Sequence, residues 1–401
     1  MTDTSYLDTK AVDAWLNVHL EGYQGPSEAQ KFAGGQSNPT FQIRAQSGAY
    51  VLRRKPPGVL LKSAHAVDRE FRVQSALKDT EVPVAQMHIL CEDDNVIGSA
   101  FYVMDMVKGR NFDDPRLPDL AFEDRKPVIQ EMNRVLAAIH DVDLVKAGLS
   151  DFGPDGNYYQ RQTDRWTKQY RASETETIED MDALMVWLEV NMPQDDGQRT
   201  LVHGDYRIDN MLFSKSSPAC LAVLDWELST LGHPYADLAS VIMQWGMAPG
   251  TEGRGLAGVD RKAQGIMEDQ EFIDAYCARR GISEIKNFGF YLAFCCFRMA
   301  GILQGVKKRA LDGNASNPER ALKMGRHVPE IAKDLLEQIV FEARKSEYVD
   351  VKSGVSARLS ITAFENLLST AERRLLRSGD DCTSIRMSDF VGIIPAITGK
   401  V

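Results

Sequence analysis

The sequence lacks several features that mark other classes of protein. Its six cysteines form no C-x-x-C pair, which argues against a cysteine metal site, and we expect reduced, mostly buried thiols in a cytoplasmic protein. The formal net charge is −10, and the sequence shows no basic stripe of the kind that binds nucleic acid. The same acidic balance disfavours docking on an anionic membrane. The first arginine is Arg44, so we expect neither a signal peptide nor an Arg-rich transit peptide.

Long apolar runs are also missing from the 401 residues. The most apolar segment, Phe288 to Val306, contains Arg298 and Gln304, and its helical periodicity predicts a core helix rather than a membrane span. Apolar residues make up 43% of the chain and charged residues 26%, which is typical of a globular protein, here with two or three domains. No G-x-S-x-G nucleophile elbow occurs, so a serine hydrolase is disfavoured.

The stretch from Leu201 to Ala239 carries the chemistry. It contains His203, Asp205 and Asn210 at the spacing His-x-Asp-x-x-x-x-Asn, which is the catalytic-loop pattern of protein kinases. At this spacing Asp205 can accept the proton of an attacking hydroxyl, while Asn210 can reach a magnesium ion bound to phosphates. We therefore predict Asp205 as the catalytic base and Asn210 as a metal ligand, with ATP and Mg²⁺ as cofactors.

A second acidic group follows this loop. Residues 221–224 read as a buried strand whose C-terminal end presents Asp225. We predict Asp225 as the second metal ligand, because Mg²⁺ prefers carboxylate and phosphate oxygens. The tripeptides His-Gly-Asp and Asp-Trp-Glu would each be ordinary turn chemistry if they stood alone. The complete set at this spacing, flanked by two apolar strands, favours a kinase-like site.

This stretch resembles the catalytic motif of the aminoglycoside phosphotransferases, a branch of the kinase-like superfamily. It is more closely similar to the phosphotransferase modules found beside acyl-CoA dehydrogenases. Asp225-Trp226-Glu227 stands where protein kinases have D-F-G. The resemblance covers about residues 9–345 and implies a bilobal α+β fold of the protein-kinase type. We expect a small antiparallel-sheet N-lobe at 1–106, a larger, mostly helical C-lobe at 107–345, and a helical extension at 346–401.

Periodicity and turn signals predict the elements of the N-lobe. We expect an amphipathic helix, then a hairpin whose strands meet at Ser47-Gly48, then a second helix and two more strands. The predicted ranges are Thr9 to Leu20, Thr40 to Gln46, Tyr50 to Arg54, His65 to Leu77, Val84 to Leu90 and Asn95 to Met104.

The resemblance also implies where a nucleotide would bind. The turn at residues 34–38 stands where kinases carry a flap over the phosphates, and Ser37 is a candidate phosphate ligand, although an ordinary turn fits almost as well. The segment after the last N-lobe strand corresponds to the hinge that holds adenine. Met104 and Met106 are candidates to line that pocket, and a plain core role fits either of them equally.

The phosphate anchor departs from the kinase pattern. Arg53 occupies the position of the lysine that contacts the α- and β-phosphates in kinases, and a slip of one or two residues would put Arg54 or Lys55 there instead. Glu70 is the expected carboxylate partner, with a solvated helix residue as the alternative.

The C-lobe is predicted to be mainly helical. Arg207 is predicted to neutralise the transferring phosphoryl group, and Asp237 resembles the family's aspartate that ties the catalytic loop to the next helix. At the end of one helix, His140 suggests a contact with the helix dipole. In similar kinases the later helices frame the acceptor pocket, so Tyr291 and Arg298 are either acceptor contacts or core residues. The predicted helices are Phe122 to His140, Tyr159 to Ala172, Ile178 to Asn191, Ser283 to Ala310, and Pro318 to about Lys345.

Together these features favour an ATP- and Mg²⁺-dependent small-molecule kinase that phosphorylates a hydroxyl group. The resemblance implies a hydroxy fatty acid or hydroxyacyl-CoA as one acceptor, with aminoglycosides or choline-type alcohols as others. The arginine in place of lysine motivates a different class, a nucleotide-binding pseudokinase that acts as a scaffold. We expect no nucleic-acid or membrane partner, and the oligomeric state is unknown.

Overall fold

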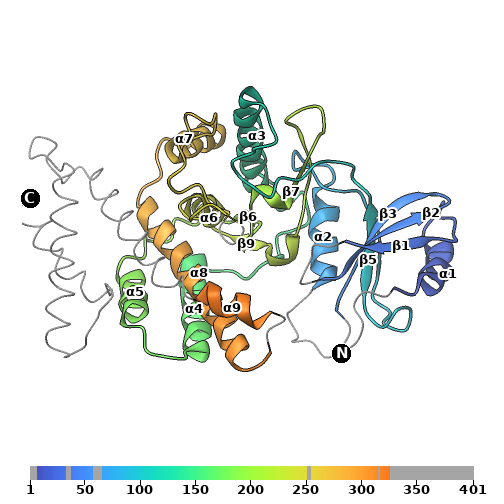
Figure 1. Ribbon diagram of the computed structural model, residues 1–401, viewed down its shortest axis with the longest axis horizontal. Helices are drawn as coiled ribbons and strands as arrows, with labels where there is room; N and C mark the ends of the chain where they lie inside the picture. The colour runs from blue at the N-terminus through green and yellow to red at the C-terminus, as the bar shows by residue number, and fades with distance from the viewer. Residues whose placement is uncertain (1–6, 33–37, 57–65, 251–253, 315–316, 326–401) are drawn as a thin grey trace, which may run out of the picture. The chain divides into compact units, whose positions relative to one another are not determined.

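The computed structural model describes residues 7–32, 38–56, 66–250, 254–314 and 317–325 (Figure 1). These residues fall into two compact units. The first comprises Met1–Pro154, Arg199–Val241 and Gly258–Ser283, and the second comprises Asp155–Gln198, Ile242–Ala257 and Glu284–Val401. Residues 34–37 of the predicted phosphate turn, which include Ser37, and the predicted extension at 346–401 lie outside the described residues. The lobe boundary at residue 106 stays a prediction.

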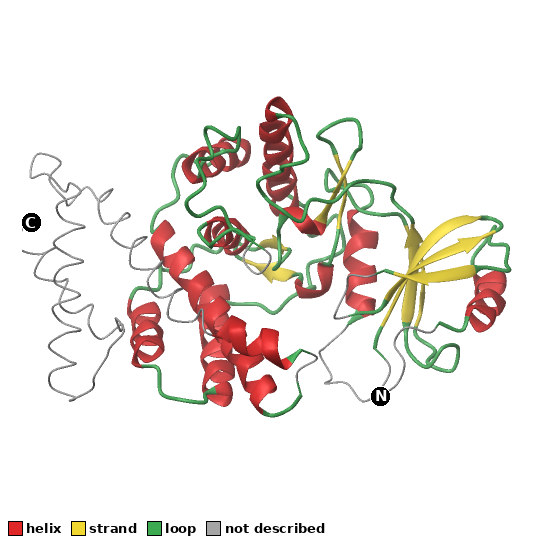
Figure 2. Ribbon diagram, in the orientation of Figure 1, coloured by secondary structure: helices red, strands yellow, loops and turns green. Residues whose placement is uncertain are grey.

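The first unit contains a five-stranded sheet in the order β1-β2-β3-β5-β4, with every neighbouring pair antiparallel (Figure 2). The predicted hairpin is confirmed, because β2 pairs with β3 and the two strands join at residues 45 to 48. The strands are β1 (Glu28–Lys31), β2 (Thr40–Ala45), β3 (Gly48–Arg54), β4 (Met87–Cys91) and β5 (Phe101–Asp105).

Two helices pack on this sheet. The predicted helices are confirmed as α1 (Thr9–His19) and α2 (Val67–Leu77). Because side chains alternate along a strand, Leu52 of β3 joins the core cluster that contains α1, and the next residue, Arg53, faces the other way. On that other face Tyr102 of β5 packs with Val67 of α2. The sheet therefore presents Arg53 to the helix that carries Glu70.

Two details of the sheet differ from the predictions. The fifth strand begins at Phe101, six residues later than expected, because Asn95 starts a turn instead. The Asp93 carboxylate holds this turn by accepting hydrogen bonds from the backbone N–H and the side-chain amide of Asn95, at 2.9 and 2.7 Å. Strand β1 was not predicted, since its sequence Glu-Ala-Gln-Lys is polar and its side chains are mostly exposed.

The rest of the first unit positions the catalytic stretch. The long helix α3 (Phe122–His140) matches its prediction, and two small antiparallel sheets pair β6 with β9 and β7 with β8. The helix α7 (Asp269–Arg280) was not predicted, although Glu268 and Glu271 form a capping box at its start that signals a helix. The remaining bounds are β6 (Thr200–Val202), β7 (Met211–Phe213), β8 (Cys220–Val223), β9 (Thr230–Gly232) and α6 (Tyr235–Trp245), the last helix ending in the second unit.

The second unit is helical. It contains α4 (Tyr158–Ser173), α5 (Glu179–Val190), α8 (Phe288–Leu311) and α9 (Pro318–Met324). Among the described residues α8 is the one helix long and apolar enough to cross a membrane, yet 67% of its apolar window is buried, as a core helix requires. Tyr291 is 6% exposed and its ring lies 5.1 Å from that of Tyr159, and the Arg298 guanidinium lies over the Trp166 ring.

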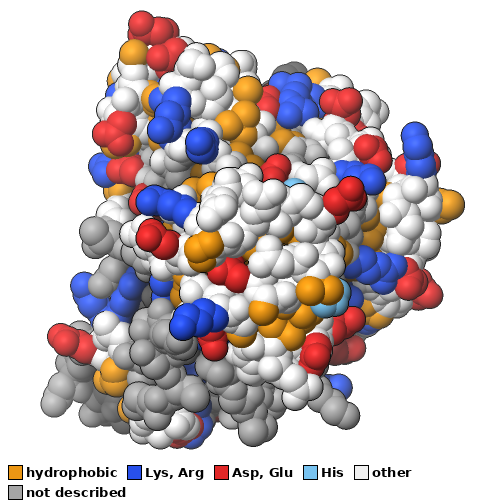
Figure 3. Space-filling model, turned by 90° about the vertical axis from the view of Figure 1, so that its right-hand side faces the viewer, with side chains coloured by type: hydrophobic (Ala, Val, Ile, Leu, Met, Phe, Trp, Pro, Cys, Tyr) orange, Lys and Arg blue, Asp and Glu red, His pale blue; other side chains and the backbone are white. Residues whose placement is uncertain are grey.

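The cysteines in the described part of the chain, Cys91, Cys220, Cys277, Cys295 and Cys296, are all buried, and none of them forms a disulfide. Their burial agrees with the expectation of buried thiols. Cys382 lies outside the described residues. On the face of the molecule seen in Figure 3, acidic and basic side chains are interspersed, and neither sign gathers into a broad patch.

Candidate functional site

The catalytic loop lies between β6 and β7 and holds Asp205 and Asn210 together. The Asn210 side-chain amide donates hydrogen bonds to the backbone carbonyl of Asp205 at 2.8 Å and to its Oδ2 at 3.1 Å. Gly204 is required by this turn, because its φ is +84° and an added Cβ would lie 2.7 Å from the Leu228 carbonyl oxygen. The loop is therefore shaped so that the two predicted functional side chains meet.

Asp237 braces this loop through hydrogen bonds to its backbone, as the resemblance implied. Its carboxylate accepts the backbone N–H groups of His203 at 2.6 Å and Gly204 at 2.8 Å. The His203 ring continues the bracing, since Nε2 lies 2.9 Å from the carbonyl oxygen of Leu224 and Nδ1 lies 3.2 Å from the backbone nitrogen of Asp205. This arrangement fits the tautomer with hydrogen on Nε2 and gives His203 a structural role.

His140 extends the network and was not predicted to do so. The ring is buried, with Nδ1 2.7 Å from the Tyr276 hydroxyl and Nε2 3.5 Å from the Asp237 carboxylate. Burial lowers the pKa of His140. Burial would raise the pKa of Asp237, but the hydrogen bond and charge of His140 outweigh it and hold that pKa low. A series of side-chain contacts therefore runs from Tyr276 of α7 through His140 to Asp237 and the catalytic loop, while the expected dipole contact stays a prediction.

Asp225 begins the short 3₁₀ turn η2 (Trp226–Leu228) in a left-handed conformation, with φ 63° and ψ 58°. Aspartate tolerates this region better than most residues. The buried Trp226 indole anchors the turn by donating to the Val223 carbonyl at 3.0 Å, and the backbone N–H of Leu224 donates to the Asn210 carbonyl at 2.8 Å. The segment that leads from β8 to Asp225 is thus bonded directly to the end of the catalytic loop.

Arg53 connects Asp225 to helix α2. The Arg53 Nε lies 2.9 Å from Glu70 Oε2, and its Nη2 lies 2.7 Å from Asp225 Oδ1 and 3.6 Å from Glu227 Oε2. Glu70 is 1% exposed and also accepts hydrogen bonds from the Asn38 amide at 2.8 Å and from Tyr102 at 3.1 Å. One guanidinium therefore bridges a buried helix carboxylate and the predicted metal ligand.

Burial and charge oppose each other in this ion pair. Burial raises the pKa of Glu70 to about 7, while the Arg53 guanidinium pulls it down. Burial alone would lower the pKa of Arg53, but the neighbouring carboxylates, with Glu70 first, raise it above its ordinary value. The guanidinium therefore stays charged, and its presence keeps the carboxylate close to titration near neutral pH.

The structure distinguishes Arg53 from its two basic neighbours. Arg54 points to the opposite side of the strand, where its guanidinium lies over the Phe41 ring at 5.6 Å. Lys55 lies 3.6 Å from the half-exposed Asp68. Arg53 is the basic residue of this strand end that contacts Glu70, which agrees with the unshifted alignment.

Arg207 reaches Asp205, the predicted catalytic base. Its Nη2 lies 3.4 Å from Asp205 Oδ2 and 3.3 Å from Asp209 Oδ2, and its side chain is 33% exposed. Asp209 therefore orients Arg207. The amide of Asn111 fixes the backbone here by donating to the Asp209 carbonyl at 2.6 Å.

The two methionines lie at the end of the sheet. Met104 is half-buried in β5, opposite Val51 of β3, and packs against the cluster that contains Val67 and Tyr102. Met106 follows β5 and is half-buried. Both positions suit a boundary between core and ligand, and their contact with adenine stays a prediction.

A metal ion would find oxygen donors in this site. In the part of the chain that the structure describes, no group of three or more His, Cys, Asp or Glu side chains could hold a metal. The site offers Asn210, whose amide oxygen accepts no hydrogen bond from the described residues, and Asp225, whose side chain is 35% exposed. An amide oxygen and a carboxylate suit Mg²⁺, which retains waters and phosphate oxygens for its other positions.

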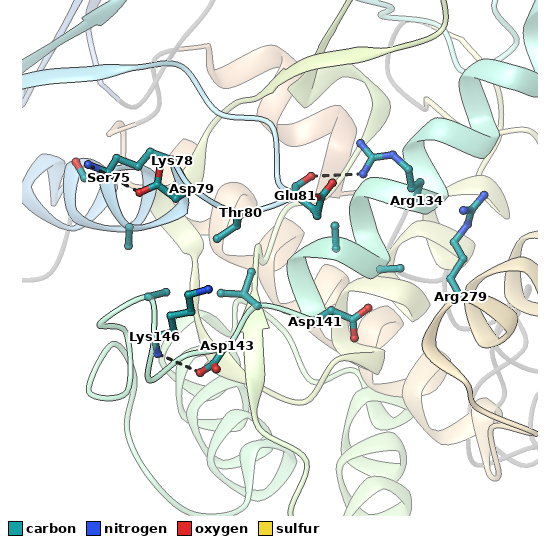
Figure 4. Close-up of a pocket in the computed structure, with 15 residues that line it drawn as sticks. Ser75, Lys78, Asp79, Thr80, Glu81, Arg134, Asp141, Asp143, Lys146 and Arg279 are labelled. Carbon is teal, nitrogen blue, oxygen red and sulfur yellow. Dashed lines mark hydrogen bonds and ion pairs between the residues drawn. The ribbon is translucent and has the colours of Figure 1, made fainter.

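A cavity of about 830 Å³ lies elsewhere in the first unit (Figure 4). Lysines and arginines such as Lys78, Arg134 and Lys146 alternate around it with Glu81 and Asp141. None of the predicted site residues lines this cavity. We therefore place the chemistry at Asp205, Asn210 and Asp225, on the evidence of their hydrogen bonds and ion pairs.

Residues 28–283 match the model of the phosphotransferase enzyme family, which covers well over half of the chain and includes every described residue of the candidate site. The chain belongs to this family. Mouse acyl-CoA dehydrogenase family member 10 is 45% identical over 313 residues, which cover 77% of this chain and 29% of that protein. The match therefore spans less than a third of that relative.

One solved structure agrees with this family, and a more distant one shows the same fold. A protein from Ralstonia eutropha JMP134, provisionally described as an aminoglycoside phosphotransferase, is 48% identical with a TM-score of 0.76, and the match covers 83% of this chain and 98% of that one. A thermostable mutant of aminoglycoside phosphotransferase APH(4)-Ia, in complex with ADP and hygromycin B, is 17% identical with a TM-score of 0.53, covering 81% and 98%. The predicted bilobal, kinase-like α+β fold is confirmed.

Proposed function

We propose that this phosphotransferase is an ATP- and Mg²⁺-dependent kinase that transfers the γ-phosphoryl group to a hydroxyl of a small metabolite. The observation that carries the proposal is the bridge from Arg53 to both Glu70 and Asp225, beside the bonded pair Asp205 and Asn210. A kinase needs a cation for the phosphates, two metal ligands and a base close together. The ADP complex of the APH(4)-Ia mutant supports a nucleotide at this site.

Each side chain then has a definite task. Mg²⁺, when bound through Asn210 and Asp225, neutralises charge on the phosphates. Arg53, held by Glu70, supplies a guanidinium to the phosphates from the other side. Asp205 accepts the proton of the acceptor hydroxyl; its Oδ1 has no partner among the described residues, while Oδ2 is held by Asn210 and Arg207. Arg207 stabilises charge on the transferring group.

The acceptor is proposed from the relatives. The match to acyl-CoA dehydrogenase family member 10 supports a hydroxyacyl-CoA or a hydroxy fatty acid as the acceptor. An aminoglycoside is the second candidate, because hygromycin B is bound in the APH(4)-Ia mutant complex. A screen with ATP labelled at the γ-phosphate, run over hydroxyacyl-CoAs, hydroxy fatty acids, aminoglycosides and choline, identifies the acceptor class.

The decisive experiment compares the wild-type protein with Asp205→Asn. We expect Asp205→Asn to fold and to bind Mg-ATP, and to lose phosphoryl transfer by about 10³-fold or more, because the proton acceptor is gone. Full activity of the variant would remove Asp205 from its proposed role. Binding of Mg-ATP by the wild type with no transfer to any acceptor would favour a pseudokinase scaffold, the alternative suggested by an arginine at the lysine position.

A further inference from the structure

Helix α2, which carries Glu70, is attached to the catalytic segment by a second arginine. The Arg69 Nη2 donates hydrogen bonds to the backbone carbonyl of Phe152 at 2.8 Å and to that of Ser229 at 3.3 Å. The Arg69 guanidinium also stacks over the Phe152 ring, 4.2 Å from its centre. Phe152 is fully buried, so this platform for the guanidinium is fixed.

The Ser229 carbonyl belongs to the turn that presents Asp225. Ser229 closes that turn, with its backbone N–H 3.1 Å and its hydroxyl 2.6 Å from the Trp226 carbonyl oxygen. Ser229 is itself 4% exposed. A hydrogen bond from Arg69 therefore reaches the backbone of the turn that starts at Asp225, and not a mobile side chain.

Arg69 and Arg53 connect helix α2 to the Asp225 turn at two different points. Arg53 bridges Glu70 and Asp225 through side chains, at 2.9 and 2.7 Å. Arg69 is the chain neighbour of Glu70 and connects the same helix to the far end of the Asp225 turn. The distance between Glu70 and Asp225 is consequently set from two sides. Arg69 makes its connection through the Ser229 backbone carbonyl. This connection would therefore remain if a metal ion took the Asp225 carboxylate from Arg53.

Arg72 provides a natural comparison on the same helix. It lies one turn after Arg69, pairs with the Asp151 carboxylate, and donates to the Gly148 carbonyl at 3.0 Å. Its guanidinium also lies near the Phe152 ring, at 5.8 Å. Arg72 thus attaches α2 to the loop before Phe152, and within the described residues none of its hydrogen bonds or ion pairs reaches the Asp225 turn.

We propose that Arg69 is a positioning residue that holds the Glu70 helix against the Asp225 turn and so keeps the Arg53 guanidinium in place for the nucleotide phosphates. The inference rests on the proposed function, because it assigns Arg69 to the nucleotide anchor of that site. The planar fork of arginine suits the task, since one group donates to two carbonyls while its face lies on an aromatic ring. Lysine offers a point charge that cannot do all three.

The test measures Mg-ATP affinity by calorimetry for the full-length wild type, Arg69→Gln and the matched control Arg72→Gln. We expect Arg69→Gln to weaken binding about tenfold, which is about 1.4 kcal/mol, and Arg72→Gln to stay within about twofold of wild type. Arg69→Lys should lie between the two, and it serves as the test variant if Arg69→Gln does not fold. Equal affinity of the Arg69 and Arg72 variants would overturn the proposal.

A double-mutant cycle separates positioning from a general loss of stability. In a Glu70→Gln background, where the helix carboxylate no longer holds Arg53, the Arg69→Gln change should cost less than about twofold in affinity. A purely structural effect would keep its full size in that background and would also contradict the proposal.

Hydrogen exchange without nucleotide distinguishes this inference from the proposed function. Arg69→Gln should speed exchange of the backbone amides at 226–230, and Arg72→Gln should leave them unchanged. Failure of the wild type to bind Mg-ATP would refute the proposed function while the exchange result still decides whether Arg69 holds the turn. Unchanged exchange in Arg69→Gln would refute the positioning role even if Mg-ATP binds.

Discussion

Replacing Arg53 by methionine tests the ion pair at the centre of the site, because methionine keeps an unbranched apolar stem and removes the charged guanidinium. Glu70 is 1% exposed, so its carboxylate would lose its cation without gaining water. In the wild type its folded-state pKa is raised from the ordinary 4.5 to about 7. A raised pKa of this kind contributes stability below pH 4.5 that is lost as pH rises to about 7.

The size of the expected stability loss in Arg53→Met follows from the pH range over which Glu70 titrates. Without Arg53 the pKa of Glu70 rises further, so the loss of stability continues above pH 7 in the variant while it has ended in the wild type. Each pH unit is worth about 1.4 kcal/mol. We expect Arg53→Met to be about 1 kcal/mol less stable than wild type at pH 6, from lost contacts, and about 3 kcal/mol less stable at pH 8.5, at the lower end for a broken buried ion pair.

Urea denaturation followed by tryptophan fluorescence at pH 6, 7 and 8.5 measures this difference. The matched control is the double variant Arg53→Met with Glu70→Gln, which removes the ionisable group, and its loss of stability relative to wild type should not grow above pH 7. Parallel pH profiles for Arg53→Met and the wild type would refute the reasoning, since Glu70 would then have no need of its cation.

Three further predictions concern the catalytic loop. Gly204→Ala should cost about 2 kcal/mol or more in unfolding free energy and most of the activity, because Gly204 has a positive φ and no room for a Cβ; wild-type melting and turnover would contradict this. Asp237→Asn should cost about 2–3 kcal/mol at pH 7, since an amide cannot accept both backbone N–H groups. The low pKa of Asp237 in the folded protein contributes stability that is lost as the pH falls through that pKa. The free energy of unfolding of Asp237→Asn should therefore fall less steeply with decreasing pH than that of the wild type. An equally steep fall would contradict this prediction. Asn210→Ala should raise the Mg²⁺ concentration for half-maximal nucleotide binding about tenfold or more, measured by titration, whereas an unaltered Mg²⁺ titration would exclude it as a ligand.

Spacing along the chain was enough to find the short-range part of the site. Asp205 and Asn210 lie five residues apart, and the short segment between them, which ends in a 3₁₀ turn at Ile208–Asn210, brings them together. Asp225 follows a recognisable buried strand, so its proximity could also be predicted. The pairing of Arg53 with Glu70 came from the kinase pattern, which left Arg54 and Lys55 as alternatives, and only the contacts in the structure distinguish Arg53 from these neighbours.

The long-range supports could not be read from the sequence. Arg69 and Ser229 are 160 residues apart, and His140 and Asp237 are 97 apart, so no local pattern links them. An arginine on a helix face or a histidine at a helix end has many ordinary roles. These contacts exist only because the fold brings the elements together, and their partners are mostly backbone carbonyls and buried groups, which carry no sequence signal.

The arginine at position 53 is consistent with an active site and is not by itself a sign of a pseudokinase. A lysine ammonium is a compact charge at the end of a flexible chain, whereas the guanidinium presents donors in different directions. Here Nε faces Glu70 while Nη2 faces Asp225 and Glu227, so the helix and the metal-ligand turn are engaged by one rigid group. Because Glu70 is buried and the Asp225 side chain is partly exposed, a metal ion can compete for Asp225 while Arg53 stays anchored by Glu70. An arginine at this position thus preserves the pairing with Glu70 and leaves Asp225, the predicted metal ligand, within reach, as the proposed phosphoryl transfer requires.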